Sequence, residues 1–164
     1  MPSKPPWYYR QSAAIPVRRS AEGVEVLLVT SRSGKRWIVP KGIVEKQLTP
    51  AESAVKEAWE EAGVRGALLP GPIGSYRYEK WGGTCTVEVF VLRVEEWADQ
   101  WPEPERRRRW AGLEEAAGEV REPDLAALVR TVAALLAEEE AADEDADAGA
   151  ARQVELERGG SRRP

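Results

Sequence analysis

Three glutamates lie within five residues in the stretch "EAWEE", at a spacing that could bind a cation. Glu57, Glu60 and Glu61 are three and four residues apart, so on a helix they share one face. Like charges at this spacing repel one another unless something positive lies close to them. Clustered carboxylate oxygens suit Mg²⁺ or Mn²⁺, which also accept backbone carbonyls and water as ligands. The spacing therefore indicates a divalent-metal site, with a solvated acidic helix face as the alternative.

The composition narrows the chemistry that this chain can carry out. It contains no histidine, which excludes histidine general bases and the zinc sites and catalytic triads that need them. Cys85 is the single cysteine, so an internal disulfide is excluded and a reducing, cytoplasmic location is expected. No apolar run reaches the roughly 20 residues of a membrane span. The start of the chain lacks the apolar stretch of a secretory signal, so export is not expected.

The helix that must carry the glutamates is marked at both ends. Thr49 is a good N-cap, Pro50 follows at the first helical position, and Glu52 completes a capping box with Thr49. Gly63 suits the left-handed residue that ends a helix. These signals predict a helix over residues 50–62. A stripe of apolar side chains, roughly opposite the glutamates, is expected to pack against a sheet. Its members are Ala51, Val55, Ala58, Trp59 and Ala62.

The remaining elements predict a mixed α/β domain. Alternating and β-branched stretches predict strands, and a second helix with one apolar face is predicted over residues 122–140. Several strands with two main helices, neither regularly alternating nor all-β, are typical of the α/β class. The main predicted strands cover residues 11–17, 24–30, 36–40 and 84–94, with a short one at Trp110.

Three regions are expected along the chain. Residues 1–6 form a flexible lead-in, residues 7–137 the domain, and residues 138–164 an acidic tail that is disordered or a helical extension. The tail carries nine acidic and four basic side chains of the 28 and 24 in the chain, which leaves 19 and 20 before it. The domain is therefore close to neutral, with local basic clusters.

From Gly42 onward the chain resembles the Nudix hydrolase family, whose signature is G-x5-E-x7-R-E-U-x-E-E-x-G-U with U a bulky apolar residue. The pattern fits without gaps, and its length makes the match specific. The signature positions met in register are Gly42, Glu57, Glu60, Glu61, Gly63 and Val64. Three positions depart from it. Lys56 replaces arginine, which keeps the charge but loses the planar fork; Ala58 is small for its slot; and Leu48 replaces the first glutamate, with Glu52 as a candidate substitute.

The resemblance extends to one branch of the family. "RWIVPKG" before the signature and "RRRRW" after it look like the diphosphoinositol-polyphosphate and diadenosine-polyphosphate hydrolases, over approximately Trp7 to Ala137. This implies an α/β/α sandwich with a mixed sheet between helices. It also implies a Mg²⁺-dependent pyrophosphohydrolase, with Mn²⁺ as a possible substitute, that cleaves a phosphoanhydride bond in a diphosphoinositol polyphosphate or a dinucleoside polyphosphate.

The resemblance assigns roles to individual residues. Glu57, Glu60 and Glu61 are expected to bind metal together with the carbonyl of Lys41, and Glu61 or Glu57 to act on the attacking water. Basic and glycine residues in the matching segments are expected to hold the polyphosphate. These are Arg10, Arg32, Lys35, Arg36, Lys41, Gly42 and Arg109.

Several readings stay open at this point. Glu88 is a further acid facing the site or a solvent-facing strand residue, and Arg106 to Arg108 are a solvated basic patch or a binding cluster. An RNA 5′-pyrophosphohydrolase is an alternative function, although a near-neutral domain without a basic stripe argues against it. A non-hydrolytic nucleotide sensor is another, suggested by Leu48 and Lys56, although the retained glutamates argue against it. The expected partner is a small polyphosphate, with no membrane contact.

Overall fold

The computed structural model describes residues 1–160, with side chains as far as residue 150. The predicted strands and both main helices are confirmed in type and approximate position. In the region of the third predicted strand, the structure has two short strands, β3 and β4. The elements in chain order are η1 (Pro6–Tyr9), β1 (Arg10–Ser20), β2 (Gly23–Thr30), β3 (Trp37–Ile38), β4 (Lys41–Ile43), α1 (Pro50–Ala62), β5 (Val64–Leu68), β6 (Gly74–Lys80), β7 (Gly83–Trp97), β8 (Arg108–Gly112), α2 (Leu113–Glu119) and α3 (Pro123–Gly160).

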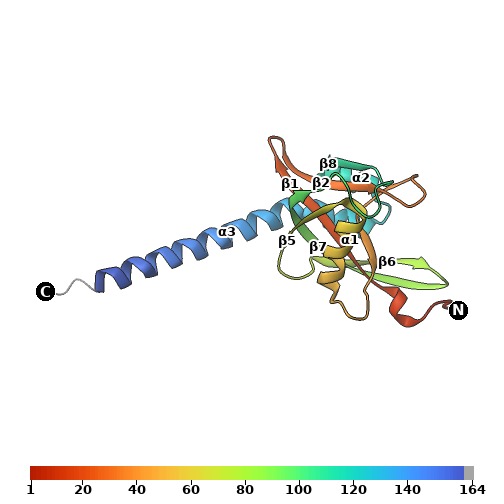
Figure 1. The fold of residues 1–164 in the computed structure, drawn as a ribbon, viewed down its shortest axis with the longest axis horizontal. Coiled ribbons are helices and arrows are strands. Elements are labelled where there is room, and N and C mark those ends of the chain that lie inside the picture. Colours follow the sequence, from red (N-terminus) through yellow and green to blue (C-terminus); the bar gives the residue numbers. More distant parts are fainter. Residues whose placement is uncertain (161–164) are drawn as a thin grey trace. The chain divides into compact units, whose positions relative to one another are not determined.

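The strands form one mixed sheet, as expected for the α/β class (Figure 1). Its central path runs β3-β2-β1-β7-β5, while β4 pairs with β1, β6 with β7 and β8 with β2. Strands β1 and β7 are parallel, and the other pairs are antiparallel. Along β1, the first residues pair with β4 and the last with β2, so the partner on this side changes in the middle of the strand.

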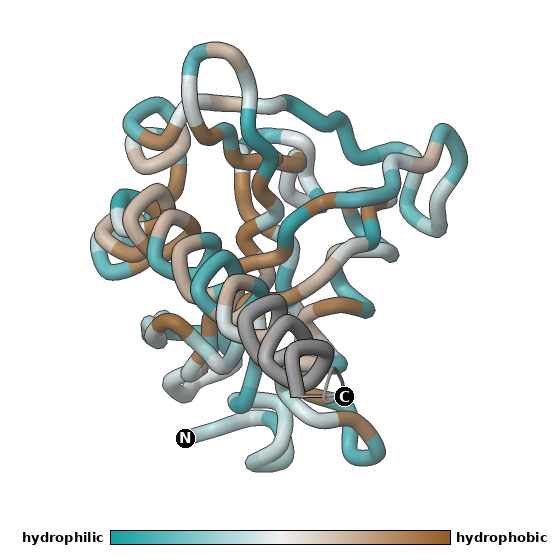
Figure 2. Tube along the Cα trace, turned by 90° about the vertical axis from the view of Figure 1, so that its left-hand side faces the viewer, coloured by the Kyte–Doolittle hydropathy of each residue, from teal (hydrophilic) through white to brown (hydrophobic). Residues whose placement is uncertain are grey.

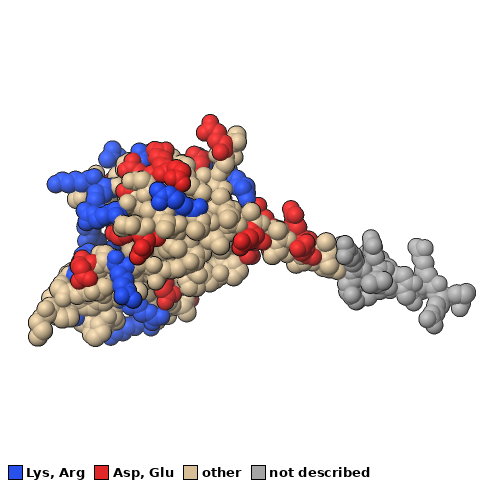
Figure 3. All heavy atoms as spheres, turned by 180° about the vertical axis from the view of Figure 1, so that it is seen from behind, with Lys and Arg blue, Asp and Glu red and all other residues tan. Residues whose placement is uncertain are grey.

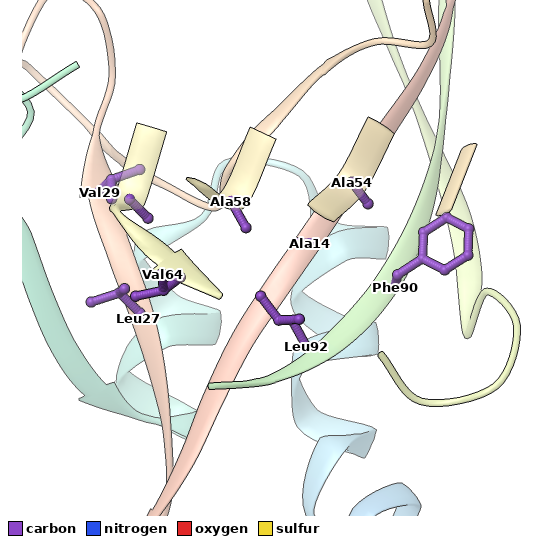
Figure 4. Close-up of a cluster of buried hydrophobic side chains, with 9 residues drawn as sticks. Ala14, Leu27, Val29, Ala54, Ala58, Val64, Phe90 and Leu92 are labelled. Carbon is purple, nitrogen blue, oxygen red and sulfur yellow. The ribbon is translucent and has the colours of Figure 1, made fainter. Parts of the chain in front are cut away.

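Helix α1 lies across one face of this sheet (Figure 1). A row of alanines, Ala54, Ala58 and Ala62, is fully buried in a core cluster with Ala14 of β1 and Phe90 of β7. Figure 4 shows Ala54 and Ala58 directed from α1 towards the strands. Side chains this small let the helix backbone approach the sheet closely. The hydrophobic segments of the interior strands appear brown in Figure 2, and most of the connecting loops are hydrophilic.

The buried face of α1 is rotated from the predicted apolar stripe. Val55 and Trp59, which were expected in the core, are only half-buried and line an open groove beside the helix. Glu61, expected on the side away from the sheet, is buried instead. The reason is the alanine row: residues four apart lie on one line, and the smallest ones in this helix occupy the line nearest to the sheet.

Helix α2 and the start of α3 cover the opposite face. Strand residues alternate between faces, and Val26 and Leu28 of β2 point away from Leu27 and Val29, which belong to the α1 core. Helix α2 contacts β2 and β8. In α3, the predicted apolar face is confirmed, because Leu125, Val129 and Val132 are buried. The layered arrangement is therefore the predicted sandwich of helices around a mixed sheet.

The chain divides into two compact units, Met1–Val132 and Ala133–Pro164. Helix α3 continues as a helix to Gly160, and alanine and glutamate, which dominate this stretch, are strong helix formers. The acidic tail over residues 138–164 stays a prediction. Residues 161–164 of the predicted tail lie outside the described residues. Over the described part of the chain, every helix lacks the combination of length and apolar character that a membrane span needs.

Candidate active site

The capping signals of α1 are confirmed. The Thr49 hydroxyl accepts a hydrogen bond of 3.1 Å from the Glu52 backbone N–H, and the Glu52 carboxylate accepts one of 2.9 Å from the Thr49 N–H. Gly63 has φ of 66°, the left-handed conformation that ends the helix. Glu52 is therefore occupied at the helix start, and it does not replace the missing glutamate at Leu48.

The other end of α1 is held by one segment of the chain, residues 98–108, which we call the clamp segment. The last carbonyls of a helix have no partners within the helix and need outside donors. In α1, each carbonyl from Glu60 to Gly63 accepts a hydrogen bond from the clamp segment. The donors in that order are Glu103 N, Trp101 Nε1, Arg108 Nη1 and Ala98 N, at 3.0, 3.1, 3.2 and 2.9 Å. The register of the glutamates on α1 is thereby fixed.

Two of the three glutamates meet beside the sheet. The carboxyl groups of Glu57 and Glu61 share a hydrogen bond, and only 4% of Glu61 is exposed. Burial raises the pKa of Glu61 well above the ordinary 4.5, and the hydrogen bond that its protonated carboxyl donates to Glu57 adds to the shift. Burial also raises the pKa of Glu57. Two carboxylates in contact need a shared proton or a cation between them.

Gly42, the middle residue of β4, explains why Glu57 can occupy this place. A Cβ atom built on Gly42 would lie 2.3 Å from Oε1 of Glu57, which is far inside van der Waals contact. The glycine therefore leaves room for the carboxylate to lie directly against the backbone of β4. Gly42 directly follows Lys41 in the chain. The contact therefore places the peptide group that contains the Lys41 carbonyl, the expected ligand, beside Glu57.

Glu60 is placed differently from its neighbours. Its Oε1 lies 3.1 Å from Nζ of Lys56, which also binds the Glu45 carboxylate. The hydrogen bond with Glu45 is the main reason why the pKa of Lys56 is raised. Among the described residues, no three acidic, histidine or cysteine side chains are gathered as a ready metal cluster. The expected set of three glutamates is therefore only partly assembled: Glu57 and Glu61 are together, and an ion pair holds Glu60.

The residues nevertheless fit a divalent cation. The donor set is made of carboxylate and carbonyl oxygens, the ligands that Mg²⁺ and Mn²⁺ prefer. The paired carboxyl groups of the half-buried Glu57 and the buried Glu61 also need a positive charge if both are to be ionised. Glu60 lies one helical turn after Glu57, and the side chains of its ion pair with Lys56 are partly exposed.

The predicted substrate residues fall into two groups. Arg10, at the start of β1, and Arg32 and Lys35, in the loop after β2, are exposed. Arg36 and Lys41 line a narrow cleft on the opposite face of the sheet from α1, and its other lining residues include Tyr76, Arg121 and Glu122. Figure 3, which views the molecule from behind, shows lysine and arginine side chains gathered along one edge.

Lys41 is the most constrained of these cations. Its Nζ donates a hydrogen bond of 3.0 Å to the Tyr78 hydroxyl, which in turn donates one of 2.6 Å to Oε1 of Gln11. Burial lowers the pKa of Lys41, and Lys80 adds to the effect. The side chain of Lys41 thus lies on one face of the sheet, while its backbone approaches the acidic pair on the other.

The four consecutive arginines alternate between the two faces, as strand residues do. Arg106 and Arg108 point towards α1. Arg107 and Arg109 lie over the ring of Trp37, at 5.6 and 4.6 Å. Nη2 of Arg109 binds Glu119 of α2 at 3.0 Å, so this residue is held by an acidic side chain and is not among those lining the cleft of Arg36 and Lys41.

Glu88 lies on the α1 side of the sheet. It precedes Phe90 by two residues in β7, and Phe90 belongs to the core beneath α1. Its strand partners are Ser12 of β1 and Ser75 of β6, and its side chain is half-buried. Of the two readings of Glu88, this position favours an acid on the side of α1, which carries the expected metal ligands and is called the metal helix below.

Three residues at the site were outside the sequence-based assignment. Glu45 supplies the partner of Lys56, Trp101 binds the carbonyl of Glu61, and Arg106 reaches the Glu61 carboxylate. Arg106 belongs to a noticeable run of arginines, but nothing in the run distinguishes it from its neighbours. Glu45 and Trp101 lie in loops, whose course the sequence does not specify.

Comparisons with known proteins identify relatives of this chain. The family profile of the NUDIX domain matches residues 8–135. "Nudix hydrolase 16, mitochondrial" of Arabidopsis thaliana is 37% identical over 113 residues, which cover 63% of this chain and 62% of that protein. "Diphosphoinositol polyphosphate phosphohydrolase 3-alpha" of Mus musculus is 38% identical over 112 residues, which cover 66% of this chain and 67% of that protein.

The fold is also found among solved structures. A C. elegans Ap4A hydrolase in a binary complex superposes with a TM-score of 0.69 at 23% identity, covering 79% of this chain and 98% of that one. At this identity the likeness concerns the fold alone. The present chain spans 62% of the length of the Arabidopsis relative. The matching profile, the signature on α1 and the shared sandwich together establish that the chain belongs to the NUDIX domain family.

Proposed function

We propose that this protein is a divalent-metal-dependent pyrophosphohydrolase that cleaves a phosphoanhydride bond in a small polyphosphorylated molecule. The expected substrate is a diphosphoinositol polyphosphate or a dinucleoside polyphosphate, and the expected metal is Mg²⁺, with Mn²⁺ as a substitute. The observation that carries the proposal is the pairing of the buried Glu61 with the half-buried Glu57, whose carboxylate lies against the backbone at Gly42. A pair of carboxyl groups is costly to bury without a role for a cation.

The roles follow from the position of each group. Glu57 and Glu61 hold the metal together with Glu60, which leaves its ion pair with Lys56, and with the Lys41 carbonyl. The ion supplies charge neutralisation at the phosphate oxygens and activation of water when it is bound. Glu61, the most buried of the three, is our candidate to accept the proton of the attacking water, with Glu57 as the alternative.

Substrate binding is assigned to the predicted cations. Arg36 and Lys41 share one cleft on the face of the sheet opposite α1, and Arg10, Arg32 and Lys35 are exposed. Charge-assisted hydrogen bonds from such side chains are suited to phosphate. Arg109 joins this group only if a polyphosphate displaces Glu119, which makes it the weakest member of the predicted set.

The relatives support the choice of substrate class. The mouse relative is named a diphosphoinositol polyphosphate phosphohydrolase, and the worm protein with the same fold is named an Ap4A hydrolase. A cytoplasmic location stays a prediction from composition, and some relatives carry the word "mitochondrial" in their names.

A substrate panel tests the proposal directly. Product formation, followed by ion-exchange chromatography, is compared for a diphosphoinositol polyphosphate, a dinucleoside polyphosphate, a nucleotide sugar and a triphosphorylated RNA, each with Mg²⁺, Mn²⁺ or EDTA. The proposal expects metal-dependent turnover to be fastest on one of the first two. Preference for the RNA would favour the alternative of an RNA 5′-pyrophosphohydrolase. Nucleotide binding without turnover on any of the four would favour the sensor.

A further inference from the structure

Arg106 is a buried arginine of the clamp segment whose guanidinium contacts two other parts of the chain. Only 8% of the residue is exposed. Nη1 donates a hydrogen bond of 2.9 Å to the Thr30 carbonyl, and Nε and Nη2 donate bonds of 3.1 and 3.0 Å to Oε1 of Glu103. Nη2 also lies 3.9 Å from Oε1 of Glu61. An arginine is suited to this task because its planar fork offers several donors in fixed directions.

The first of these parts is the end of β2. Thr30 is the last residue of the strand, and the loop with Arg32, Lys35 and Arg36 follows immediately. A second link reinforces the contact, because the Thr30 hydroxyl accepts a hydrogen bond of 3.0 Å from the backbone N–H of Arg107. The strand end that leads into the proposed substrate loop is therefore fixed to the clamp segment.

The second part is the metal helix. Glu103 binds α1 through its backbone N–H, which donates to the Glu60 carbonyl at 3.0 Å, while its carboxylate holds Arg106. Glu61 thus has the Glu57 carboxyl on one side and the Arg106 guanidinium on another. The Arg106 guanidinium limits where the Glu61 carboxylate can turn. The guanidinium is itself held in place by the Thr30 carbonyl of β2 and, through Glu103, by α1.

We propose that Arg106 is a positioning residue that fixes the Glu61 carboxylate relative to the end of β2, and so aligns the metal-holding edge of α1 with the loop that carries the substrate cations. The proposal rests on the proposed function for its effect on turnover. Its effect on metal binding can be measured without any substrate. Arg106 acts through Glu61 and contacts no reacting atom.

The sharpest test uses Arg106→Lys, which keeps the charge and loses the fork. If Arg106 acted only through its positive charge, this variant would bind metal like the wild type. Positioning predicts Mn²⁺ binding about tenfold weaker and kcat about tenfold lower, with KM unchanged, as is typical for groups that orient metal ligands. Mn²⁺ binding is followed by the electron paramagnetic resonance of the free ion, without substrate, at a temperature where both proteins are folded.

Two further variants make the test decisive. Glu103→Gln weakens the hydrogen bonds that hold Arg106, at a residue that is half-buried. It is expected to weaken Mn²⁺ binding and lower kcat, as Arg106→Lys does, but by a smaller factor. It replaces Arg106→Lys in the test if that variant does not fold. Arg18→Gln is the matched control, because the Arg18 guanidinium also binds a glutamate, Glu25, at 3.0 Å, but on the exposed strand pair. It is expected to leave Mn²⁺ binding and kcat unchanged.

The proposal would be overturned if Arg106→Lys and Glu103→Gln bound Mn²⁺ and turned over substrate like the wild type. It would also be overturned if only KM rose. A rise in KM alone would instead make Arg106 a substrate contact. Failure of the proposed function is distinct: the wild type would then bind Mn²⁺ but hydrolyse none of the polyphosphates, and the Mn²⁺ measurements would still decide the role of Arg106.

Discussion

The indole N–H of Trp101 donates a hydrogen bond of 3.1 Å to the backbone carbonyl of Glu61, the most buried acid of the metal helix. The same ring lies against Gly63, where an added Cβ would come within 2.9 Å of it, and over the guanidinium of Arg108. A loop tryptophan thus fixes the last turn of the helix that carries the proposed metal ligands. Loop packing and the position of these glutamates are linked through this one contact.

Replacing Trp101 by phenylalanine should loosen this end of α1. The ring is mostly retained, but the Glu61 carbonyl loses its donor, and an unsatisfied buried carbonyl costs about 1–3 kcal/mol. We expect a lower free energy of unfolding in urea and faster amide hydrogen exchange in the last turn of α1. Trp7→Phe, at an exposed tryptophan, is the control. Unchanged exchange at this turn in the Trp101 variant would contradict the role of the clamp segment.

Gly42→Ala should displace Glu57 while leaving the fold intact. The new Cβ meets the far end of a flexible side chain, so the carboxylate can move away at little cost to stability. We expect kcat and Mn²⁺ affinity to fall by about 10- to 100-fold, with little change in melting temperature. Activity assays, calorimetry and thermal unfolding on one preparation measure all three.

Gly118→Ala is the control for this substitution, because nothing lies within 4 Å of a Cβ at that position in α2. It should leave activity unchanged. If Gly42→Ala were as active as the wild type, then Glu57 would not need its place against the β4 backbone, and the proposed metal site would be incorrect.

The metal-free protein should lose stability as the pH rises. The pKa of Glu61 is raised in the folded state, chiefly by burial and then by Glu57, with Arg106 opposing the shift. Above the ordinary value of 4.5, the unfolded chain releases this proton while the folded protein retains it. The contribution of Glu61 is therefore fully present below 4.5 and is lost as the pH rises through the folded pKa.

Urea unfolding in EDTA from about pH 5 to about pH 8 measures this dependence. The difference between wild type and Glu61→Gln isolates Glu61, because the amide does not titrate. Wild type should lose stability relative to the variant as the pH rises, and Mn²⁺ should reverse the trend, since metal binding favours the deprotonated ligands. A difference that does not vary with pH would contradict the buried, protonated state of Glu61.

The ion pair between Glu45 and Lys56 should contribute little to stability. Its side chains are 39% and 37% exposed, and such pairs are worth up to about 1 kcal/mol and are screened by salt. Glu45→Gln should lower the free energy of unfolding by less than about 1 kcal/mol at low salt. The difference should shrink when the titration is repeated at high salt, and a large, salt-independent loss would indicate that Glu45 has another structural role.

Much of this architecture could be predicted from local signals. The capping box at Thr49, the left-handed Gly63 and the signature spacing specify α1 and its glutamates without reference to the rest of the chain. The β-branched run of β7 likewise marks the central strand. These features depend on residues close together in sequence, so a single sequence contains them in full.

The contacts between distant segments could not be predicted in the same way. Whether Lys56 binds Glu45 or another acid depends on the course of the loop before α1. Which arginine of the run reaches Glu61 depends on the register of β8 against β2, since a shift of one residue would exchange the two faces. The alanine row decides the rotation of α1, because packing against the sheet favours small residues over the more hydrophobic Val55 and Trp59.

The central claim is that the acids of α1 hold a divalent cation. Calorimetric titration of Mn²⁺ into the wild type, Glu57→Gln and Glu61→Gln tests it most directly, with circular dichroism to verify the fold of each. The account predicts saturable heat for the wild type that is strongly reduced in both variants. Equal Mn²⁺ binding by all three folded proteins, or none by the wild type, would contradict it.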